Sequence, residues 1–268
     1  MVLSLRSVNS NPIALKGEAL GPGSERAGAG ALEVDLEKSY GDFRLKATFA
    51  LAGPGVTVVF WPSGAGKTTL LSLLAGLAKP DRGFIRHQGR TLYDSAKKIF
   101  VAPEKRNFSY VFQRALLFTH FSVKTNLLFA AKFGGRPLEP GAFARAVGLL
   151  GLEELLSRQP RSLSGGEAQR VAIGRALLAQ GDLLIMDEPL SSLDRERKDE
   201  LLAYIVQIPE RFGAPIVYVT HAEDELRLLA DRVLTVERGQ CQLKTRAEFE
   251  LGWGQLKGGP GLSGVGAN

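Results

Sequence analysis

The residues best suited to chemistry lie in the segment 61–69, Trp-Pro-Ser-Gly-Ala-Gly-Lys-Thr-Thr. It follows a β-branched run, Val56–Phe60, and precedes a helical pattern, which is the context that a phosphate-binding loop requires. Its glycines let backbone N–H groups converge on a phosphate, and the helix N-terminus favours an anion. Lys67 can reach the β- and γ-phosphates of a nucleotide, and the Thr68 hydroxyl can bind Mg²⁺. We expect the phosphates to be held by Ser63, Gly64, Ala65, Gly66, Lys67, Thr68 and Thr69.

Trp61 departs from the nucleotide-binding pattern, which begins with glycine at this place. Because Pro62 follows, the backbone of Trp61 is biased towards β or polyproline angles, which tryptophan can adopt. We therefore expect the loop to keep its shape. The alternative is a chain in which the tryptophan impairs hydrolysis.

Two carboxylates, Asp187 and Glu188, follow the apolar run 183–186. Open parallel sheets bind ligands at the C-terminal ends of their strands. We expect Asp187 to hold Mg²⁺ through water, and Glu188 to orient or deprotonate an attacking water. An acidic pair at such a place could instead cap the next helix, so this interpretation depends on the phosphate loop.

A second anion site is predicted at Ser164, Gly165 and Gly166, which precede a helical pattern rich in Ala and Leu. The first N–H groups of a helix have no intrahelical partner and can bind a phosphate. Ser164 with Glu167 three residues later is also the pattern of an ordinary capping box. The residues alone leave both readings open.

The run 163–169, shortly before a strand ending in Asp-Glu, resembles the signature of ATP-binding-cassette (ABC) ATPases. Other motifs similar to those of this family occur in the expected order over about residues 32–250. Gln113 resembles the residue of a glutamine loop, residues 191–194 resemble a D-loop, and His221 resembles the switch histidine. Tyr40, placed before the first long strand, resembles the aromatic residue that stacks on adenine. Phe43 is the alternative to Tyr40.

The resemblance implies a homodimer with ATP between the phosphate loop of one chain and residues 164–166 of the other. Gln113 would contact Mg²⁺ and the attacking water, and Asp194 would connect the two sites. His221 would contact the γ-phosphate and stabilise charge in the transition state. The implied catalytic residues are thus Glu188, His221 and Gln113, and the implied metal-binding residues are Thr68, Gln113 and Asp187.

Within the family, the chain most resembles the ATP-binding subunits of bacterial molybdate importers. The stretches that carry this likeness are residues 91–94, 103–106, 110–113, 117–118 with His120, and 175–178. The implied function is ATP hydrolysis that powers import of an oxyanion, molybdate, through an integral membrane permease, with an extracytoplasmic binding protein as an indirect partner. Subunits for sulfate, ferric iron and polyamines share several of these stretches and stay open as alternatives. The chain would be peripheral, at the cytoplasmic face of the inner membrane.

The elements that position these motifs alternate between strand and helix patterns, which favours an α/β fold. Val56–Phe60, residues 183–186 and Ile216–Thr220 are expected as buried strands, and residues 68–77 as a helix. Helical patterns interrupt the alternation from about 115 to 175, which predicts an inserted helical subdomain. With the resemblance, the expected fold is a P-loop NTPase of the ABC type, with a mostly parallel central sheet and an antiparallel β portion.

The ends of the chain are rich in small residues and have little to bury. Residues 1–30 are expected to be a disordered extension, with an organellar transit peptide as the alternative, and residues 251–268 a flexible Gly-rich tail. The ATPase domain is expected over 31–250.

Composition limits the classes of function. The net charge of +6 is mild and its basic residues are scattered, which argues against a nucleic-acid partner. No run approaches the roughly 20 apolar residues of a membrane span. The single cysteine, Cys241, cannot form an internal disulfide. A soluble cassette ATPase of DNA repair or translation is disfavoured because the sequence shows no coiled coil, zinc module or tandem cassette.

Overall fold

The computed structural model describes residues 32–60, 66–133, 137–191, 193–209, 215–237 and 240–257. The predicted N-terminal extension, Trp61 and the loop residues Ser63, Gly64 and Ala65 lie outside the described residues. The described part of the phosphate loop therefore begins at Gly66.

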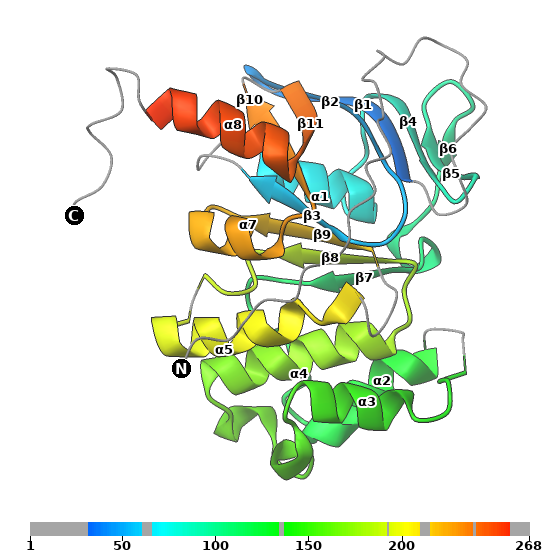
Figure 1. Ribbon diagram of the computed structural model, residues 1–268. Coiled ribbons are helices and arrows are strands. Elements are labelled where there is room, and N and C mark those ends of the chain that lie inside the picture. Colours follow the sequence, from blue (N-terminus) through cyan, green and yellow to red (C-terminus); the bar gives the residue numbers. More distant parts are fainter. Residues whose placement is uncertain are drawn as a thin grey trace.

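The strands of the described residues form one sheet in the order β6-β5-β4-β1-β2-β11-β10-β3-β9-β8-β7 (Figure 1). Strands β10, β3, β9, β8 and β7 run parallel, whereas β6, β5, β4, β1 and β2 pair antiparallel. The parallel centre and the antiparallel portion are as the sequence predicts. The bounds are β1 Leu32–Tyr40, β2 Phe43–Leu51, β3 Val56–Phe60, β4 Arg82–His87, β5 Arg90–Asp94, β6 Ile99–Phe100, β7 Phe108–Val111, β8 Leu183–Asp187, β9 Ile216–Thr220, β10 Arg232–Glu237 and β11 Gln240–Thr245.

The parallel strands are apolar throughout because both of their faces are covered. All five residues of β3 are buried, as are all five of β9. Since side chains alternate along a strand, Val58 and Tyr218 belong to one hydrophobic core and Val59 and Val219 to the other. The expected buried strands are confirmed.

The helices lie on both sides of the parallel strands (Figure 1). Helix α1 shares a core with the antiparallel strands β1, β2 and β4 on one face, and α2, α3, α4, α5 and α7 contribute to the core of the other face. Helices α2, α3 and nearly all of α4 fall within the stretch where a helical insertion was expected. The bounds are α1 Lys67–Ala75, α2 Val123–Phe133, α3 Ala142–Leu149, α4 Gly165–Leu178, α5 Arg195–Ile205, α7 Glu223–Leu229 and α8 Arg246–Lys257.

Helix α8 corrects the predicted start of the C-terminal tail. It continues to Lys257, whereas a flexible tail was expected from 251. Its first turn is stabilised by Glu248, which accepts hydrogen bonds from the N–H and hydroxyl groups of Thr245. Phe249 is buried against Phe60 of β3, with ring centroids 5.8 Å apart. These contacts anchor the start of α8, which continues beyond residue 250, the expected end of the domain.

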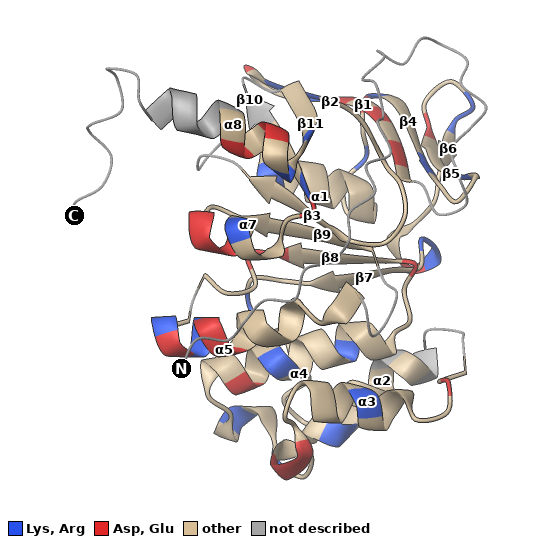
Figure 2. Cartoon of the chain, in the orientation of Figure 1, with Lys and Arg blue, Asp and Glu red and all other residues tan. Residues whose placement is uncertain are grey.

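Charged side chains of both signs are spread over the helices and the outer strands, and the central parallel strands carry few (Figure 2). This mixture agrees with the scattered basic residues of the sequence. Among the described residues, no helix has the length and apolar character needed to cross a membrane.

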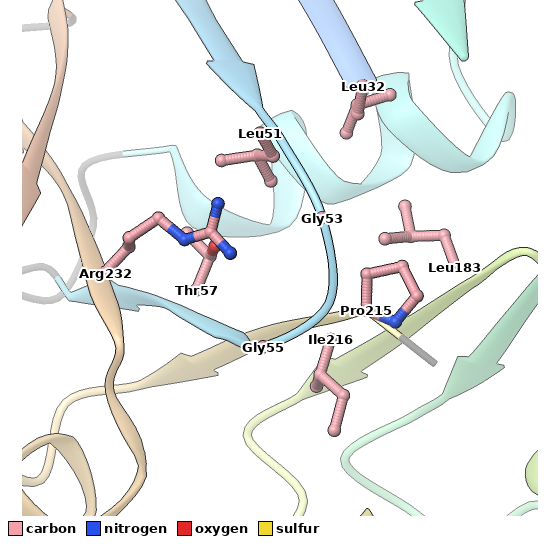
Figure 3. Close-up of a pocket in the computed structure, with 9 residues that line it drawn as sticks. All are labelled: Leu32, Leu51, Gly53, Gly55, Thr57, Leu183, Pro215, Ile216 and Arg232. Carbon is pink, nitrogen blue, oxygen red and sulfur yellow. The ribbon is translucent and has the colours of Figure 1, made fainter. Parts of the chain in front are cut away.

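A small pocket lies at the N-terminal ends of β3, β8 and β9 (Figure 3). Leu51, Leu183 and Ile216 line it, and the backbone at Gly53 and Gly55 passes over it. Its volume of about 10 Å³ is at most that of one water molecule. Ligands of parallel sheets bind at the opposite, C-terminal ends of the strands, so we regard this pocket as a packing defect.

His87 is a buried histidine at the end of β4 that packs edge-on against Phe108 of β7, with ring centroids 5.1 Å apart. Neither ring nitrogen has a hydrogen-bond partner within the described part of the chain. Burial lowers the pKa of His87, and the charge of Asp182 opposes this only in part. Protonation of His87 is therefore unfavourable in the folded chain.

We expect His87→Phe to reduce the loss of stability in mild acid. An unfolded histidine takes up its proton as the pH falls through about 6.5, whereas the folded His87, with its lowered pKa, resists, so acid favours unfolding. The variant removes this difference. Melting temperatures between pH 7.5 and 5.5 should fall less in His87→Phe than in the parent, and His120→Phe, at an exposed histidine, is the control. Parallel curves for parent and His87→Phe would contradict the prediction.

Candidate active site

The described end of the phosphate loop lies where β3 leads into α1. Gly66 is the N-cap of α1, with φ 101°, a left-handed conformation that favours glycine. A Cβ atom there would come within 2.5 Å of the Phe43 ring, so a side chain has no room. Lys67 is the first residue of the helix, and the exposed Thr68 follows it. The first N–H groups of α1 thus start beside Phe43 of β2.

Lys67, Glu188 and His221 form a cluster at the C-terminal ends of β8 and β9. The Lys67 ammonium donates to Glu188 Oε1 at 2.9 Å, and its side chain is only 9% exposed. His221 Nδ1 lies 3.5 Å from Glu188 Oε2. The His221 side chain is 56% exposed and thus open to a ligand. The structure brings together three groups that are 121 and 33 residues apart in the chain (188 − 67 and 221 − 188).

Glu188 has a positive φ of 44°, which is uncommon for a residue other than glycine. Its N–H donates to the Val219 carbonyl, and its own carbonyl accepts from the N–H and hydroxyl of Ser191. These bonds keep the backbone in a costly conformation, which is a frequent property of functional sites.

The charge of Lys67 keeps Glu188 ionised. Partial burial by itself raises the pKa of Glu188, but the hydrogen bond and charge of Lys67, with a contribution from His221, outweigh burial. The net pKa of Glu188 is below its usual value. The carboxylate is therefore an acceptor at neutral pH, as a group that orients water must be.

Asp187, the last residue of β8, has the opposite shift. Burial raises its pKa and the charge of Glu188 adds to this, while a hydrogen bond from Tyr110 and the charge of Lys67 lower it. The Tyr110 hydroxyl donates to Asp187 Oδ2 at 3.1 Å. Burial and the proximity of Asp187 raise the pKa of Tyr110, so the hydroxyl stays protonated and donates.

Gln113 is exposed and lies beside the same strand end. Its Nε2 donates to Ser191 Oγ at 3.0 Å, and Ser191 Oγ donates to the Glu188 carbonyl. Gln169 of α4 donates to the carbonyl of Phe112, and this hydrogen bond holds the residue just before Gln113 in place. The glutamine is thus connected to the backbone of Glu188 through one hydroxyl.

The donor set fits Mg²⁺. Among the described residues, no group of three or more His, Cys, Asp or Glu side chains could hold a metal ion. Mg²⁺ does not need such a cage, since it is commonly bound by one or two carboxylates together with phosphates and waters. Asp187, the Thr68 hydroxyl and the Gln113 amide oxygen offer the hard oxygen donors that this mode uses.

Ser164 is the N-cap of α4 and forms a complete capping box. The Glu167 N–H donates to Ser164 Oγ at 3.3 Å, and the Ser164 N–H donates to Glu167 Oε2 at 2.7 Å. Gly165 is exposed at the first turn, whereas Gly166 is buried beside Arg197 of α5. Capping and anion binding are compatible, because a cap satisfies only part of the free N–H groups of a helix start.

Ser164 and Glu188 line two different cavities. One, of about 240 Å³, is lined by Ser164, Gly166 and Arg197 among others, and one of about 120 Å³ by Glu188, Thr220 and His221 among others. The two share no lining residue. Within the described residues, Ser164 and Glu188 therefore face separate cavities.

Tyr40 is placed differently from the expectation. It is the last residue of β1 rather than a residue ahead of the first long strand, because the hairpin turn follows it and pairs it with Phe43. Its ring is half-exposed, and the Lys38 ammonium lies 5.0 Å from the ring centroid. Phe43 is the aromatic residue that contacts Gly66.

Two contacts were not foreseen in the sequence. The Tyr110 hydroxyl on Asp187 and the Ser191 hydroxyl between Gln113 and Glu188 join residues about 77 positions apart. Both residues lie inside motifs quoted above, but their spacing to their partners carries no periodic signal. Only the pairing of β7 with β8 brings them together.

The fold and this site define a class of protein. The sequence model of the ABC transporter family matches residues 46–191, slightly more than half of the chain. The chain belongs to this family. Among curated relatives, the Molybdenum import ATP-binding protein ModC of Mannheimia succiniciproducens is 49% identical over 209 residues, which cover 78% of this chain and 58% of the relative.

A second relative and one solved structure are also similar to this chain. The ModC protein of Rhodospirillum rubrum is 50% identical over 215 residues, covering 78% of this chain and 56% of that protein. The chain thus spans slightly less than three fifths of the length of these two relatives. The structure of cbiO1 from Clostridium perfringens, described as part of the ABC transporter complex cbiONQ, has a TM-score of 0.69 and 26% identity over 84% of this chain and 92% of that one.

Proposed function

We propose that this chain is the ATP-hydrolysing subunit that powers import of an oxyanion, molybdate, through a membrane permease. The observation that carries the proposal is the Lys67–Glu188–His221 cluster at the C-terminal ends of parallel strands. The relatives named for molybdenum import, at 49% and 50% identity, support the substrate. Sulfate, ferric iron and polyamines are the alternative substrates.

The phosphates of ATP would lie at the N-terminus of α1, where Gly66 allows a close approach of the backbone and Lys67 supplies a positive charge. Binding of a phosphate by Lys67 would release the Glu188 carboxylate from its ion pair. Glu188 would then orient and deprotonate the attacking water. The exposed imidazole of His221 would contact the γ-phosphate and stabilise the charge that develops there.

Mg²⁺, when bound, would neutralise charge on the phosphates. Asp187, Thr68 and Gln113 are the residues that would hold it or its waters. The Gln113–Ser191 hydrogen bond would keep the amide beside the strand end that carries Glu188. Tyr40 or Phe43 would stack on the adenine, and the contact between Phe43 and Gly66 favours Phe43.

Two copies of the chain would complete each site. Residues 164–166 of a second copy would supply free helix N–H groups to the nucleotide bound by Lys67 of the first. Among the described residues, Ser164 and Glu188 line different cavities, which supports this arrangement. Asp194 is the N-cap of α5 and would connect the two sites.

The permease would contact the helical part, α2 to α4, and would hold the chain at the cytoplasmic face of the membrane as a peripheral subunit. An extracytoplasmic binding protein would deliver the anion to the permease. The loop before α2 supports this assignment, because it exposes Phe112 and Leu116. Arg175 of α4 holds the loop in place by donating to the carbonyls of Ala115 and Leu116.

The experiment is ATP turnover by the chain reconstituted with its permease in liposomes. We expect Mg-dependent hydrolysis that increases when a molybdate-loaded binding protein is added, and no increase with sulfate-loaded protein. If sulfate, ferric iron or a polyamine increases hydrolysis and molybdate does not, that compound is the transported substrate instead of molybdate. Absence of any hydrolysis, with nucleotide still bound, would favour a hydrolysis-impaired subunit.

Trp61 is the residue that motivates this second candidate. A tryptophan at the start of the phosphate loop would crowd the approach to it, and a displacement of about 1 Å can lower a rate on the order of a hundredfold. We expect Trp61→Gly to hydrolyse ATP faster than the parent, with similar nucleotide affinity. Turnover and affinity of both proteins should be measured under the same conditions, and equal turnover would make Trp61 a neutral substitution.

A further inference from the structure

Tyr110 lies beside Asp187, one of the proposed metal-binding residues. It lies in β7, which pairs in parallel with β8, and its register partner there is Ile185. Because side chains alternate along a strand, Ile185 and Asp187 share one face of β8, and Tyr110 reaches along this face to Asp187. Its hydroxyl donates to Asp187 Oδ2 at 3.1 Å.

The hydroxyl restrains an otherwise adjustable carboxylate. Among the described residues, the Tyr110 hydroxyl donates a hydrogen bond to the Asp187 side chain. The nearby charges of Lys67 and Glu188 act on Asp187 with opposite signs. A neutral donor on Oδ2 orients the carboxylate without neutralising it, and leaves Oδ1 for the ion or one of its waters.

Tyr110 is itself held by its neighbours. It is partly buried in the core that contains Ile185, and its ring packs on Phe112 with centroids 4.3 Å apart. Gln113, the other proposed metal-binding side chain of this region, follows immediately after Phe112. One short segment, 110–113, therefore contacts the carboxylate and supplies the amide.

We propose that Tyr110 is a positioning residue for the Mg²⁺ site, acting through Asp187 and aligning this carboxylate with Gln113. The inference rests on the proposed function, because it concerns the ion that would accompany ATP. Hydrogen-bond partners of metal-binding carboxylates fix ligand orientation, and their loss typically lowers metal affinity by roughly 10–100-fold. Because we expect Asp187 to hold Mg²⁺ through a water, we expect the lower end of this range.

The test is Tyr110→Phe, which removes the hydroxyl and keeps the ring. Binding of Mn²⁺ to the protein–ATP complex is measured by electron paramagnetic resonance, and binding of metal-free ATP is measured separately in the presence of a chelator. We expect the Mn²⁺ dissociation constant to rise about tenfold. Affinity for metal-free ATP should be unchanged, which a general loss of structure would not produce.

Two further variants make the result specific. Tyr93→Phe is the matched control, since that buried hydroxyl donates to the Pro80 carbonyl and not to Asp187, and it should leave Mn²⁺ affinity unchanged. In an Asp187→Asn background, Tyr110→Phe should cause no further loss, because the hydroxyl acts through the carboxylate. Full additivity of the two substitutions would overturn the inference.

Other outcomes also separate the two proposals. Unchanged Mn²⁺ affinity in Tyr110→Phe, or an equal loss of metal-free ATP binding, would overturn the role of Tyr110 and leave the proposed function intact. A parent chain that binds neither ATP nor Mn²⁺ with ATP would overturn both.

Discussion

Replacing Glu188 by glutamine is expected to lower ATP hydrolysis by roughly 10²–10⁴-fold, the usual contribution of a general base. Glutamine has nearly the same shape but cannot accept a proton from water. The ionised state of Glu188, maintained by Lys67 and His221, is the property that this substitution removes. Steady-state turnover at saturating Mg-ATP measures the effect.

The same variant is expected to bind ATP at least as tightly as the parent. Glu188 Oε1 lies 2.9 Å from the Lys67 ammonium, so a phosphate that binds to Lys67 must displace a carboxylate. An uncharged amide competes less for the lysine. Trapping of an ATP-bound dimer, detected by light scattering, should accompany the loss of turnover.

The control is Glu104→Gln, at an exposed glutamate in the short helical turn Pro103–Lys105. This turn precedes the N-terminal end of β7, whereas the site lies at the C-terminal ends of the parallel strands. It should change neither turnover nor affinity. Full turnover by Glu188→Gln would remove this residue from the catalytic role. Weaker ATP binding by Glu188→Gln would show that its ion pair with Lys67 supports the phosphate site instead of competing with it.

The strands that position the site could be predicted because burial on both faces leaves a clear mark in the sequence. Val56–Phe60 and Ile216–Thr220 are short runs of apolar and β-branched residues, and both are strands with these bounds. The acidic pair at 187–188 was placed at a strand end by the same reasoning. Local composition is sufficient where every residue of a strand meets the core.

Contacts between distant segments could not be predicted in this way. The positive φ of Glu188 could not be predicted, because a hydrogen bond to the distant Val219 carbonyl helps to maintain it. Tyr40 was expected ahead of the first long strand, whereas it ends β1, and the hairpin brings the alternative residue, Phe43, to Gly66. The end of α8 was missed because Phe249 packs on a strand almost 190 residues earlier. Such features depend on tertiary pairing, for which a single sequence carries no periodic signal.

Arg106 is the residue whose loss should destabilise the fold most clearly. Its side chain is 1% exposed, and its guanidinium donates to the carbonyls of Leu73, Leu74 and Val101 at 2.6–3.0 Å. Leu73 and Leu74 are in the last turn of α1, where the helix dipole favours a cation, and the Leu73 carbonyl also accepts from the N–H of Gly76. Gly76, with φ 79°, leaves space for the guanidinium, because a Cβ atom there would lie 2.5 Å from Arg106 Nε.

Two effects compete when Arg106 is replaced by methionine. Removing a buried cation recovers its desolvation energy, which burial already expresses by lowering the pKa of Arg106 to about 10. Against this, the buried carbonyls lose their charged donor, and each such bond contributes about 1.5–3 kcal/mol. Because Arg106 serves three carbonyls and is cationic at neutral pH, we expect the lost bonds to dominate.

We therefore expect Arg106→Met to lower the free energy of unfolding by about 3 kcal/mol, which is a drop of roughly 6–12 °C in melting temperature for a chain of this size. Lys105→Met, at the exposed neighbour, is the control and should change the melting temperature little. Arg106→Lys should lie between the two, since an ammonium can serve fewer of the three carbonyls than the guanidinium fork. A melting temperature of Arg106→Met equal to or above that of the parent would show that desolvation of the guanidinium outweighs its hydrogen bonds. The anchor of α1, and with it the helix that begins at Lys67, would then rest on the apolar contacts of Leu70, Leu71, Leu73 and Leu74.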